Sequence, residues 1–508
     1  MISPAYAGSD IFFDCKILQH SKRSYFGSIA IQIVLCHSGD MQKFWAKNWK
    51  MLVLVGLLFG TLPLTVPLAQ KAWKILTGAS YQAAAIVVDA SSPQKPLVRM
   101  WDGVAQGFEK LPDSDFRMSA VTGLLKNVGV KYVRIDHVFD GYSVVSRVDG
   151  RLTYDWSKLD ALVGDIVAAG ATPYISISYM PSAISKGDIL DTPNDWGEWA
   201  QVVSALVGHY SRDYRGGLSN VIYEVWNEPD LFGGWKMYGN KSYTQMYTVA
   251  SRAANGVRGV KPFKIGGPAT TGFYPAWVNG FYDKLDESVR IDFFSWHRYS
   301  ADVEDFVKDA ETAKKMMETR IARSQDLYIS EWGVNPERGS FYDGLWAAAH
   351  YLAVNTALSE TNIDLALAFE VMDGAPGDAQ WHGGWGMLTN PKYGAVAKKP
   401  RFKAWEMLTK LRGQKLPEVG EGTYVTSLSA VDDTGVIRVL LVNFDINGKH
   451  SEVFPLTVVG LGEGNYTVKE EYLTGRVLNT EALVVGGNIR REISLGPSEA
   501  VLLTLSRR

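Results

Sequence analysis

Short β-branched and aromatic runs alternate with longer stretches of helical period between about residues 97 and 412. Such an alternation is typical of the βα units of a parallel sheet. Eight strands are predicted, at residues 98–106, 130–137, 172–179, 220–229, 264–269, 291–299, 326–333 and 365–374. Eight βα units predict an α/β fold, a closed (β/α)8 or TIM barrel, which we place at residues 80–412.

One of the helical segments lies between the second and third predicted strands. Its apolar residues recur three and four apart, and Gly170 closes it; they are Trp156, Leu159, Leu162, Val163, Ile166 and Val167. This spacing predicts a helix that buries one face.

The pattern changes after Gly413 to alternating apolar and polar positions without helical period. Five runs are separated by Gly, Asn and Asp turns, at residues 423–432, 435–445, 451–461, 465–473 and 499–506. Period-two runs between turn residues predict antiparallel strands. We therefore predict a small antiparallel β-sandwich-like domain at residues 413–508.

An uncharged apolar run at residues 51–69 precedes the predicted barrel. It is flanked by basic residues, namely Lys43, Lys47 and Lys50 before it and Lys71 and Lys74 after it. This pattern is typical of an export signal or a single membrane anchor, with the main body outside the cytoplasmic membrane. A buried helix is the alternative.

Features of the same run bear on whether it is cleaved. Pro63, Pro67 and its short length favour cleavage, whereas the lack of a small-x-small site before Gln70 favours retention. We lean to an anchor, and so expect membrane association through residues 51–69. Residues 1–50 fit neither a domain nor a signal, and we expect translation to start at Met41 or Met51.

Composition narrows the chemistry. A formal net charge of −2 leaves no basic surplus for a nucleic-acid backbone, so we expect no nucleic-acid partner. The two cysteines, Cys15 and Cys36, precede both predicted domains, which therefore contain no disulfide or thiol chemistry. The eight histidines form no HxH or HExxH pattern, and we expect no metal site and no cofactor. A mechanism based on carboxylates remains.

Glu228 follows the apolar run of the fourth predicted strand, in Trp226-Asn227-Glu228-Pro229. Pro229 cannot donate a sheet hydrogen bond and keeps its predecessor extended, so the strand ends here. The alternative is a solvated carboxylate at a helix start, but the preceding apolar run favours a strand terminus. Since the carboxyl ends of barrel strands face the active site, Glu228 is a candidate catalytic residue.

Glu331 ends a second apolar run, residues 327–330, three units later and before Trp332 and Gly333. Alone, this glutamate is either a nucleophile or a member of a buried ion pair. Together with Glu228 it matches the requirement of glycoside hydrolysis for two carboxyl groups flanking one bond. Asn227 adds an amide that can bond a sugar hydroxyl.

These motifs resemble the clan of retaining (β/α)8 glycosidases. Within it, residues 226–230, the run Asp292–Tyr299 and the trailing β-domain are most similar to glycoside hydrolase family 39, over roughly residues 97–505. The resemblance implies Glu228 as acid/base and Glu331 as nucleophile of a double displacement. It also implies that Asn227 contacts the sugar 2-hydroxyl and that His297 and Tyr299 form the wall near the nucleophile.

One position departs from the family pattern. There the strand-two arginine is followed two positions later by a histidine, whereas here Arg134 is followed by Asp136, with His137 one further. A shift of one residue turns a side chain to the other face of a strand. We therefore expect Asp136 rather than His137 to contact the substrate. Arg134 and Tyr299 are the expected partners that keep Glu331 ionised, while Glu228 must be protonated.

Other residues compete for these roles or surround them. Glu224 lies deeper on the strand of Glu228, where an ion pair with Arg134 is the expected use. On strand eight lie Glu370 and Asp373, and we expect Asp373, with Trp381, His382 and Trp385 of the following loop, to shape the sugar subsites. Trp332 and Trp385 are candidate substrate contacts, although packing alone could explain such tryptophans.

The sequence thus predicts a retaining glycosidase that acts on an oligo- or polysaccharide. An endo-acting exopolysaccharide hydrolase and an exo-acting β-xylosidase-like enzyme remain open. A non-catalytic carbohydrate-binding envelope protein that keeps the fold is a further alternative, but both candidate glutamates are present. A membrane-associated scaffold is suggested only by residues 51–69.

Overall fold

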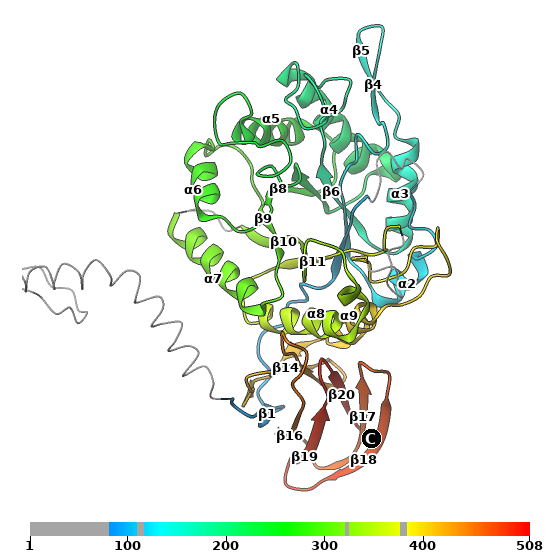
Figure 1. Ribbon diagram of the computed structural model, residues 1–508, viewed down its shortest axis with the longest axis vertical. Coiled ribbons are helices and arrows are strands. Elements are labelled where there is room, and N and C mark those ends of the chain that lie inside the picture. The colour runs from blue at the N-terminus through cyan, green and yellow to red at the C-terminus, as the bar shows by residue number, and fades with distance from the viewer. Residues whose placement is uncertain (1–80, 109–115, 321–324, 376–383) are drawn as a thin grey trace, which may run out of the picture. The chain divides into compact units, whose positions relative to one another are not determined.

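A closed barrel of eight parallel strands confirms the predicted fold class (Figure 1). The computed structural model describes residues 81–108, 116–320, 325–375 and 384–508. Each predicted run overlaps one barrel strand, in the order β2 (Gly103–Gln106), β3 (Tyr132–Ile135), β6 (Thr172–Ile177), β7 (Val221–Val225), β8 (Phe263–Thr270), β9 (Phe293–Tyr299), β10 (Asp326–Gly333) and β11 (Leu365–Phe369). Neighbours along the chain are neighbours in the barrel, and β11 closes it against β2.

Helices surround the barrel. They are α2 (Thr122–Val128), α3 (Ser157–Ala168), α4 (Trp196–Gly208), α5 (Tyr243–Gly256), α6 (Pro275–Lys284), α7 (Val303–Arg320), α8 (Leu345–Leu358) and α9 (Pro400–Lys410). The helix predicted around residues 156–170 is α3, and it buries Leu159, Leu162 and Ile166 as its spacing requires. The apolar faces of the helices and the outer faces of the strands form one large core.

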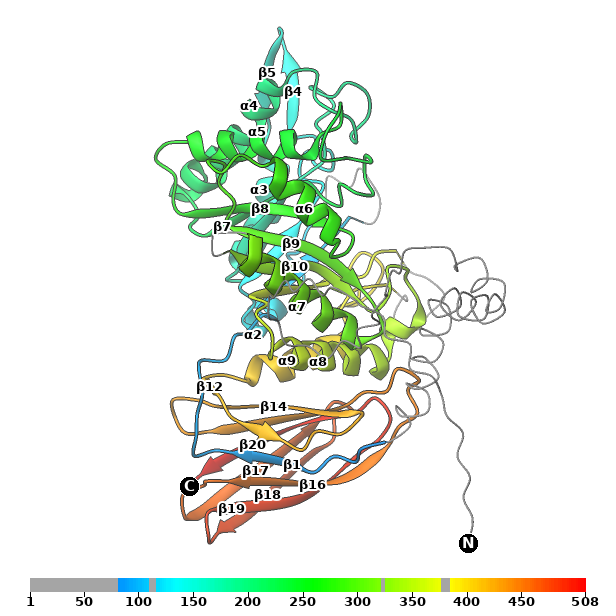
Figure 2. The same cartoon turned by 90° about the vertical axis from the view of Figure 1, so that its left-hand side faces the viewer.

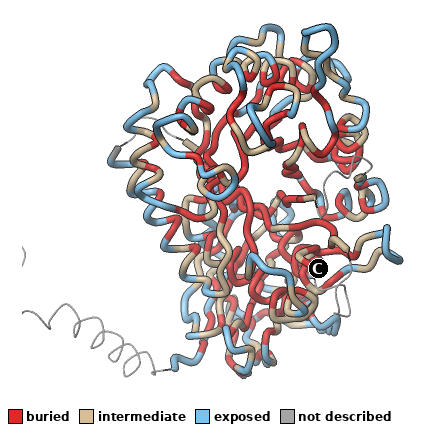
Figure 3. Tube along the Cα trace, turned by 45° about the horizontal axis from the view of Figure 1, so that its top comes forward, coloured by how far each residue is buried: buried red, intermediate tan, exposed pale blue. Residues whose placement is uncertain are grey.

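Short elements complete this part of the chain. The hairpin β4 (Val145–Val148) and β5 (Arg151–Tyr154) follows β3, a π-helical turn His209–Asp213 continues α4, and 3-10 turns cover Tyr214–Gly216 and Ser340–Asp343. Figure 3 shows the barrel strands as largely buried. Inside the barrel, a separate apolar cluster includes Tyr174, Ile222, Phe293 and Tyr328, which leaves the polar groups of the strands to gather at the carboxyl ends.

Two sheets form the β-domain and confirm the predicted second fold element (Figure 2). One has the order β13-β1-β16-β19 and the other β12-β14-β15-β20-β17-β18. The strands are β1 (Ile86–Asp89), β12 (Gln414–Lys415), β13 (Glu418–Val419), β14 (Val425–Val431), β15 (Ile437–Asn443), β16 (Glu452–Val459), β17 (Gly464–Tyr472), β18 (Val477–Val484), β19 (Asn488–Leu495) and β20 (Ala500–Arg507). Alternate side chains from both sheets share one core.

Strand β1 differs from the expectation that the barrel domain begins at residue 80. It pairs parallel with β16 and antiparallel with β13, so this segment belongs to a sheet of the β-domain although it precedes the barrel in sequence. The predicted anchor or signal, residues 51–69, and the N-terminal extension lie outside the described residues. Within the part of the chain that the structure describes, no helix is long and apolar enough to cross a membrane.

Candidate active site

Glu228 lies just beyond the end of β7. Trp226 and Glu228 have positive φ angles of 72° and 46°, a conformation that is costly for side chains of this size. The amide of Glu228 donates to the carbonyl of Ala269, 3.0 Å away, and so ties the segment to the neighbouring strand β8. Glu228 is therefore not extended, which differs from the expectation based on Pro229, and β7 already ends at Val225. The turn that follows the strand presents the Glu228 carboxyl group at the mouth of the barrel.

Glu331 lies within β10, close to its carboxyl end. The register of β10 against β9 shifts between Ile329 and Glu331, and beyond the shift Glu331 pairs with His297. The hydroxyl of Tyr299 donates to Glu331 Oε1 at 2.7 Å, and Arg134 donates to Oε2 at 3.1 Å. The carboxylate is thus oriented by two donors on different strands.

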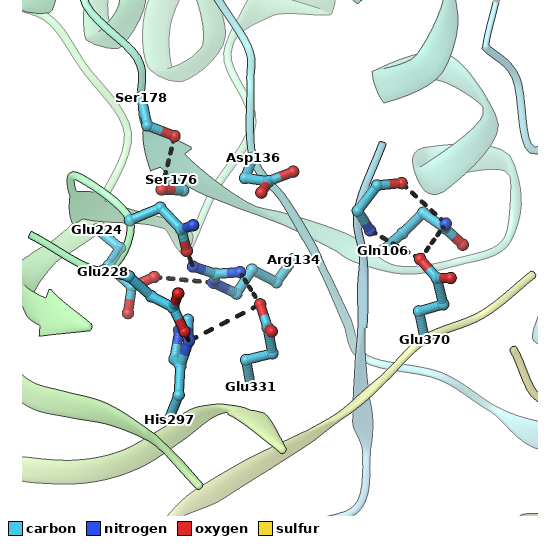
Figure 4. Close-up of polar contacts among 12 residues, drawn as sticks. Gln106, Arg134, Asp136, Ser176, Ser178, Glu224, Glu228, His297, Glu331 and Glu370 are labelled. Atoms are coloured by element: carbon cyan, nitrogen blue, oxygen red, sulfur yellow. Dashed lines mark hydrogen bonds and ion pairs between the residues drawn. The ribbon is translucent and has the colours of Figure 1, made fainter. Parts of the chain in front are cut away.

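The two glutamates face each other across His297 (Figure 4). His297 Nδ1 lies 2.8 Å from Glu228 Oε1 and 3.9 Å from Glu331 Oε2. One oxygen of each carboxyl group and one imidazole nitrogen lie within 4.8 Å of one another. The side chains of Glu228 and Glu331 keep 13% and 12% exposure, whereas His297 has none, so only the carboxyl groups are open to a ligand.

Arg134 connects the site to the barrel interior. Its guanidinium donates to Glu224 at 2.8 Å and to Asn227 at 2.6 Å, besides Glu331. The ion pair with Glu224 predicted from the sequence is confirmed. Tyr174 also donates to Glu224, at 2.7 Å, so this deep carboxylate is fully engaged. Since Arg134 is only 1% exposed, its fork fixes three acceptors in one plane.

Asn227 is held from both ends of its amide. Its oxygen accepts from Arg134, and its nitrogen donates to the hydroxyl of Tyr179, 2.8 Å away. Tyr179, which sequence reasoning did not select, follows β6. The only sequence signal for it was its position at the end of the third predicted strand.

Asp136 and His137 lie beyond the end of β3, His137 with a positive φ angle of 50°, and His137 Nε2 lies 4.0 Å from Asp136 Oδ2. Asp136 is 7% exposed, and its Oδ1 atom has no hydrogen-bond partner among the described residues. Figure 4 shows its carboxyl group above the Arg134 network. His137 instead bonds Asp140 at 2.8 Å and packs edge-on against Tyr179.

Trp332 does not face the site, which contradicts its predicted role as a substrate contact. Its side chain is 1% exposed and stacks on Tyr351 of α8, with ring centres 5.4 Å apart, while Phe306 of α7 meets it edge-on. Because neighbouring strand residues face opposite sides, an inward Glu331 places Trp332 in the layer between strands and helices. Trp385 is half-buried against Phe369 at the end of β11, close to the barrel mouth.

Glu370 follows β11 and accepts hydrogen bonds that the sequence did not indicate. The side-chain amide of Gln106 and the backbone amide of Gly107 donate to its Oε2 atom at 2.8 and 3.2 Å. Burial, with the charges of nearby Asp373 and Glu331, raises the pKa of Glu370 well above its usual value. A cavity of about 440 Å³ adjoins it, with Arg117 and Tyr393 in its wall.

We expected Asp373 to shape an open sugar subsite. It belongs instead to a closed ion cluster. Lys399 Nζ donates to both of its carboxylate oxygens, at 3.0 and 2.9 Å, and also contacts Asp343 at 2.7 Å. The side chains of Lys399 and Asp373 are completely buried. The backbone amide of Gly386 adds a bond of 2.7 Å to Asp373, so the cluster fastens the loop after β11. Trp381 and His382 lie outside the described residues.

Burial and neighbouring charges together shift the pKa values of Glu331, His297 and Glu224. Burial raises the pKa of Glu331, and the charges of His297 and Arg134 act against that rise. Burial lowers the pKa of His297, but Glu331 and Glu228 outweigh it, so the net pKa is raised. Burial likewise opposes ionisation of Glu224, yet Arg134 holds its pKa below the usual range.

Glu228, His297 and Glu331 are also close enough together to hold a metal ion. Two features disfavour a cation there. His297 Nδ1 already bonds Glu228, and the Arg134 guanidinium, itself a cation, lies 3.1 Å from Glu331. The arrangement suits a reaction that needs one proton donor and one ionised carboxylate.

Comparison with known families and proteins shows what this chain is similar to. The model of the family "Glycosyl hydrolases family 39" matches residues 84–439. The chain is 25% identical over 343 residues to a β-xylosidase of Geobacillus stearothermophilus, covering 58% of this chain and 65% of that protein. It is 28% identical over 324 residues to a β-xylosidase of Caldicellulosiruptor saccharolyticus, covering 57% and 64%. Both matches span less than two thirds of the relative's length.

Solved structures show the same fold. A family 39 enzyme from Xanthomonas axonopodis pv. citri superimposes with a TM-score of 0.70 at 20% identity, covering 85% of this chain and 99% of that one. A monomeric β-xylosidase from Caulobacter crescentus CB15 gives a TM-score of 0.71 at 20% identity, with coverage of 84% and 100%.

Proposed function

The chain belongs to family 39 of the glycosyl hydrolases, and from this premise we propose that it is a retaining glycosidase with Glu331 as nucleophile and Glu228 as acid/base. One observation carries the proposal. Oxygens of the two carboxyl groups lie within 4.8 Å of each other. Retaining enzymes hold their carboxyl groups about 5–5.5 Å apart, whereas inverting enzymes leave roughly 6.5–9.5 Å for a water molecule.

The first step is attack of a Glu331 oxygen on the anomeric carbon. As that bond forms, the bond from the anomeric carbon to the leaving oxygen breaks, and Glu228 gives its proton to that oxygen. Arg134 and Tyr299 oppose the rise in the pKa of Glu331 that burial causes, and they orient its carboxylate for the attack. The product is a glycosyl ester of Glu331 with inverted configuration.

The second step returns the enzyme to its starting state. Glu228, now ionised, takes a proton from a water molecule whose oxygen attacks the anomeric carbon, and the ester bond to Glu331 breaks. Two inversions give net retention. His297, which contacts Glu228 and approaches Glu331, keeps the two carboxyl groups in register through both steps.

We assign sugar recognition to the residues around this pair. Asn227 is pre-oriented by Arg134 and Tyr179 to meet the sugar 2-hydroxyl, and Asp136 lies above the same network. Tyr299 and Trp385 form the wall of the subsite, and His297 lies enclosed behind the two carboxyl groups. The proposed substrate is an oligo- or polysaccharide.

The names of the curated relatives favour an exo-acting, β-xylosidase-like enzyme. An endo-acting exopolysaccharide hydrolase is the alternative. A screen of aryl β-glycosides, xylo-oligosaccharides and bacterial exopolysaccharides separates the two. Release of single sugars from chain ends supports exo action, and early loss of viscosity supports endo action.

The test of the mechanism is chemical rescue. Glu331→Ala should abolish turnover of an aryl glycoside, and azide should restore part of it with inversion, because azide attacks from the face that Glu331 leaves open. The matched variant Glu228→Ala should give an azide product with retained configuration. Rescue of Glu331→Ala with retention would contradict the assignment of roles.

We also propose that the chain works outside the cytoplasmic membrane, with residues 51–69 as signal or anchor and residues 413–508, completed by β1, as a β-domain next to the barrel. The apolar run and its basic flank support this. N-terminal sequencing after membrane fractionation tests it. An intact cytoplasmic form that begins before residue 51 would refute export.

A further inference from the structure

The turn that follows β7, residues 228–235, carries exposed apolar residues next to the candidate active site. Leu231 and Phe232 come three and four residues after Glu228, and they are 59% and 37% exposed. Tyr274, in the turn after the neighbouring strand β8, is 43% exposed. Single exposed apolar residues are common on protein surfaces, so exposure alone does not indicate a ligand. The contacts that hold these side chains carry the argument further.

Hydrogen bonds fix the turn relative to the candidate acid/base. The amides of Leu231 and Phe232 donate to the carbonyl of Glu228, at 3.0 and 2.7 Å. The indole of Trp226 donates to the carbonyl of Phe232 at 3.0 Å, and its ring packs edge-on against the buried Trp235, with ring centres 5.2 Å apart. The backbone that carries Phe232 is therefore tied to the backbone that carries Glu228.

The ring of Phe232 is continuous with the residues around the catalytic pair. It meets the ring of Tyr179 at an angle of 71°, with ring centres 5.8 Å apart. The hydroxyl of Tyr179 in turn accepts a hydrogen bond from Asn227, at 2.8 Å. An edge-on contact between two rings occupies at most one face of either ring. Phe232 is thus held in place beside the site while part of its ring stays open to a ligand.

Tyr274 is joined to the same turn through side chains. Its hydroxyl lies 3.0 Å from the hydroxyl of Thr271. Thr271 donates both its hydroxyl and its amide to the carboxylate of Asp230, two residues after Glu228. Two neighbouring turns, each with an exposed aromatic ring, therefore form one hydrogen-bonded segment beside the acid/base.

The leaving group of the proposed reaction lies on the side of these turns. Glu228 must contact the leaving oxygen to protonate it, and Glu331 attacks the anomeric carbon from the other side. The part of the substrate beyond the leaving oxygen is therefore next to Glu228. A pyranose presents C–H groups on the faces of its ring, and aromatic side chains stack on such faces. A ring that is already held in place loses little conformational freedom when it binds.

We propose that Phe232 and Tyr274 form the subsite for the leaving-group sugar, with Phe232 as the main stacking surface and Tyr274 as a second one. This inference rests on the proposed function and deepens it. The substrate class is an oligo- or polysaccharide with a pyranose on the leaving side of the cleaved bond, rather than a glycoside of a small alcohol.

Two substrates with the same reacting sugar and different leaving groups test this proposal. They are xylotriose and β-xylosyl fluoride, or the same pair built on another sugar that the screen identifies. Fluoride ion carries no sugar that could reach Phe232. Phe232→Leu keeps an apolar side chain but removes the ring, and it should lower kcat/KM for the trisaccharide about tenfold and for the fluoride less than about twofold. Tyr274→Leu should lower kcat/KM for the trisaccharide by a smaller factor.

Two controls isolate the role of the ring. Phe232→Tyr keeps it and should keep both values near those of the wild type, and Leu231→Ala, an exposed position of the same turn without a ring, should do the same. Turnover of the fluoride shows that each variant is folded.

Equal losses for both substrates in Phe232→Leu would mean that the ring acts through Tyr179 and Asn227, and would overturn the proposal. An unchanged kcat/KM for the trisaccharide, or the same loss in Phe232→Tyr, would overturn it as well. Failure of the proposed function gives a different result, because the wild type would then turn over neither substrate, and this subsite would be refuted with the glycosidase.

Discussion

Two buried ion clusters lie near the same end of the barrel, one centred on Arg134 and the other on Lys399. Both cations are almost completely enclosed, at 1% and 0% exposure. Around Lys399 the carboxylate of Asp373 is also fully enclosed, whereas around Arg134 the carboxylate of Glu331 keeps 12% exposure. The clusters therefore differ in whether their carboxylates are accessible to a ligand.

The difference separates a structural use of charge from a chemical one. Lys399 and its partners satisfy one another and fasten backbone atoms of Gly384 and Gly386. Arg134 uses its planar fork to fix acceptors on separate strands and leaves one face of Glu331 free. Burial of a charge thus indicates function only where a partner remains accessible.

Replacement of a carboxylate by an amide, at Glu331 in one cluster or at Asp373 in the other, should give the largest contrast between the two clusters. Glu331→Gln should lower kcat by about 10⁴-fold or more, because the amide cannot form the ester, while unfolding in urea changes little. The amide oxygen still accepts from Tyr299. Asp373→Asn should show the reverse, with reduced stability and much smaller loss of kcat. Equal kinetic losses in the two variants would remove the distinction.

Removal of the lysine should cost mainly stability. Lys399→Met leaves two buried carboxylates without a cation and should destabilise the fold by about 3–5 kcal/mol in urea unfolding. The neighbouring variant Lys398→Met breaks an exposed pair with Glu406 and should change stability by less than about 1 kcal/mol.

The pH dependence sharpens the lysine test. Burial already raises the pKa of Asp373, and loss of Lys399 raises it further. A carboxyl group whose folded-state pKa lies above the unfolded value destabilises the fold as pH rises. Lys399→Met should accordingly lose more stability at pH 8 than at pH 5. A loss that is independent of pH would show that packing, rather than charge, is responsible.

Removal of the arginine should change catalysis and its pH profile together. Arg134→Met should lower kcat/KM by roughly 10²-fold, because a charge that orients and stabilises the nucleophile is lost. Its positive charge lowers the pKa of Glu331, so its loss raises that pKa and moves the acidic limb of the profile to higher pH. Arg147→Met, at an exposed pair with Glu198, should leave the profile in place.

The smallest effect is expected for the hydroxyl of Tyr299. Tyr299→Phe removes one donor to Glu331 and should lower kcat by about tenfold, with a shift of the acidic limb in the same direction as for Arg134→Met but smaller. Tyr238→Phe, at a residue 74% exposed, is the matched control. A wild-type profile in Tyr299→Phe would mean that Arg134 alone orients the nucleophile.

The barrel could be predicted because its signals are local. Each strand is an apolar run, and the place of Glu228 follows from Pro229 next to it. The ion pair of Arg134 with Glu224 could also be anticipated from strand direction. The Trp332 prediction was wrong for a reason the sequence already held, since a strand that turns Glu331 inward turns its neighbour outward.

Other features depend on closure of the fold and have no local signal. Gln106 meets Glu370 because the last barrel strand closes against the first. Lys399 forms its ion pairs only because the fold brings Asp343 and Asp373 together from different loops. Strand β18 was not predicted because most of its residues are exposed on both faces, which removes the period-two pattern.

The position of β1 has a consequence for the order in which the chain can fold. This strand leaves the ribosome before any part of the barrel, yet its partners β13 and β16 follow the whole barrel in the chain. The nascent chain must carry β1 unpaired until the barrel has been synthesised, and its docking then joins the two ends of the described chain. A fragment that starts at residue 413 would lack this central strand and expose the edges of β13 and β16, so the β-domain is completed by the whole chain rather than by its last hundred residues.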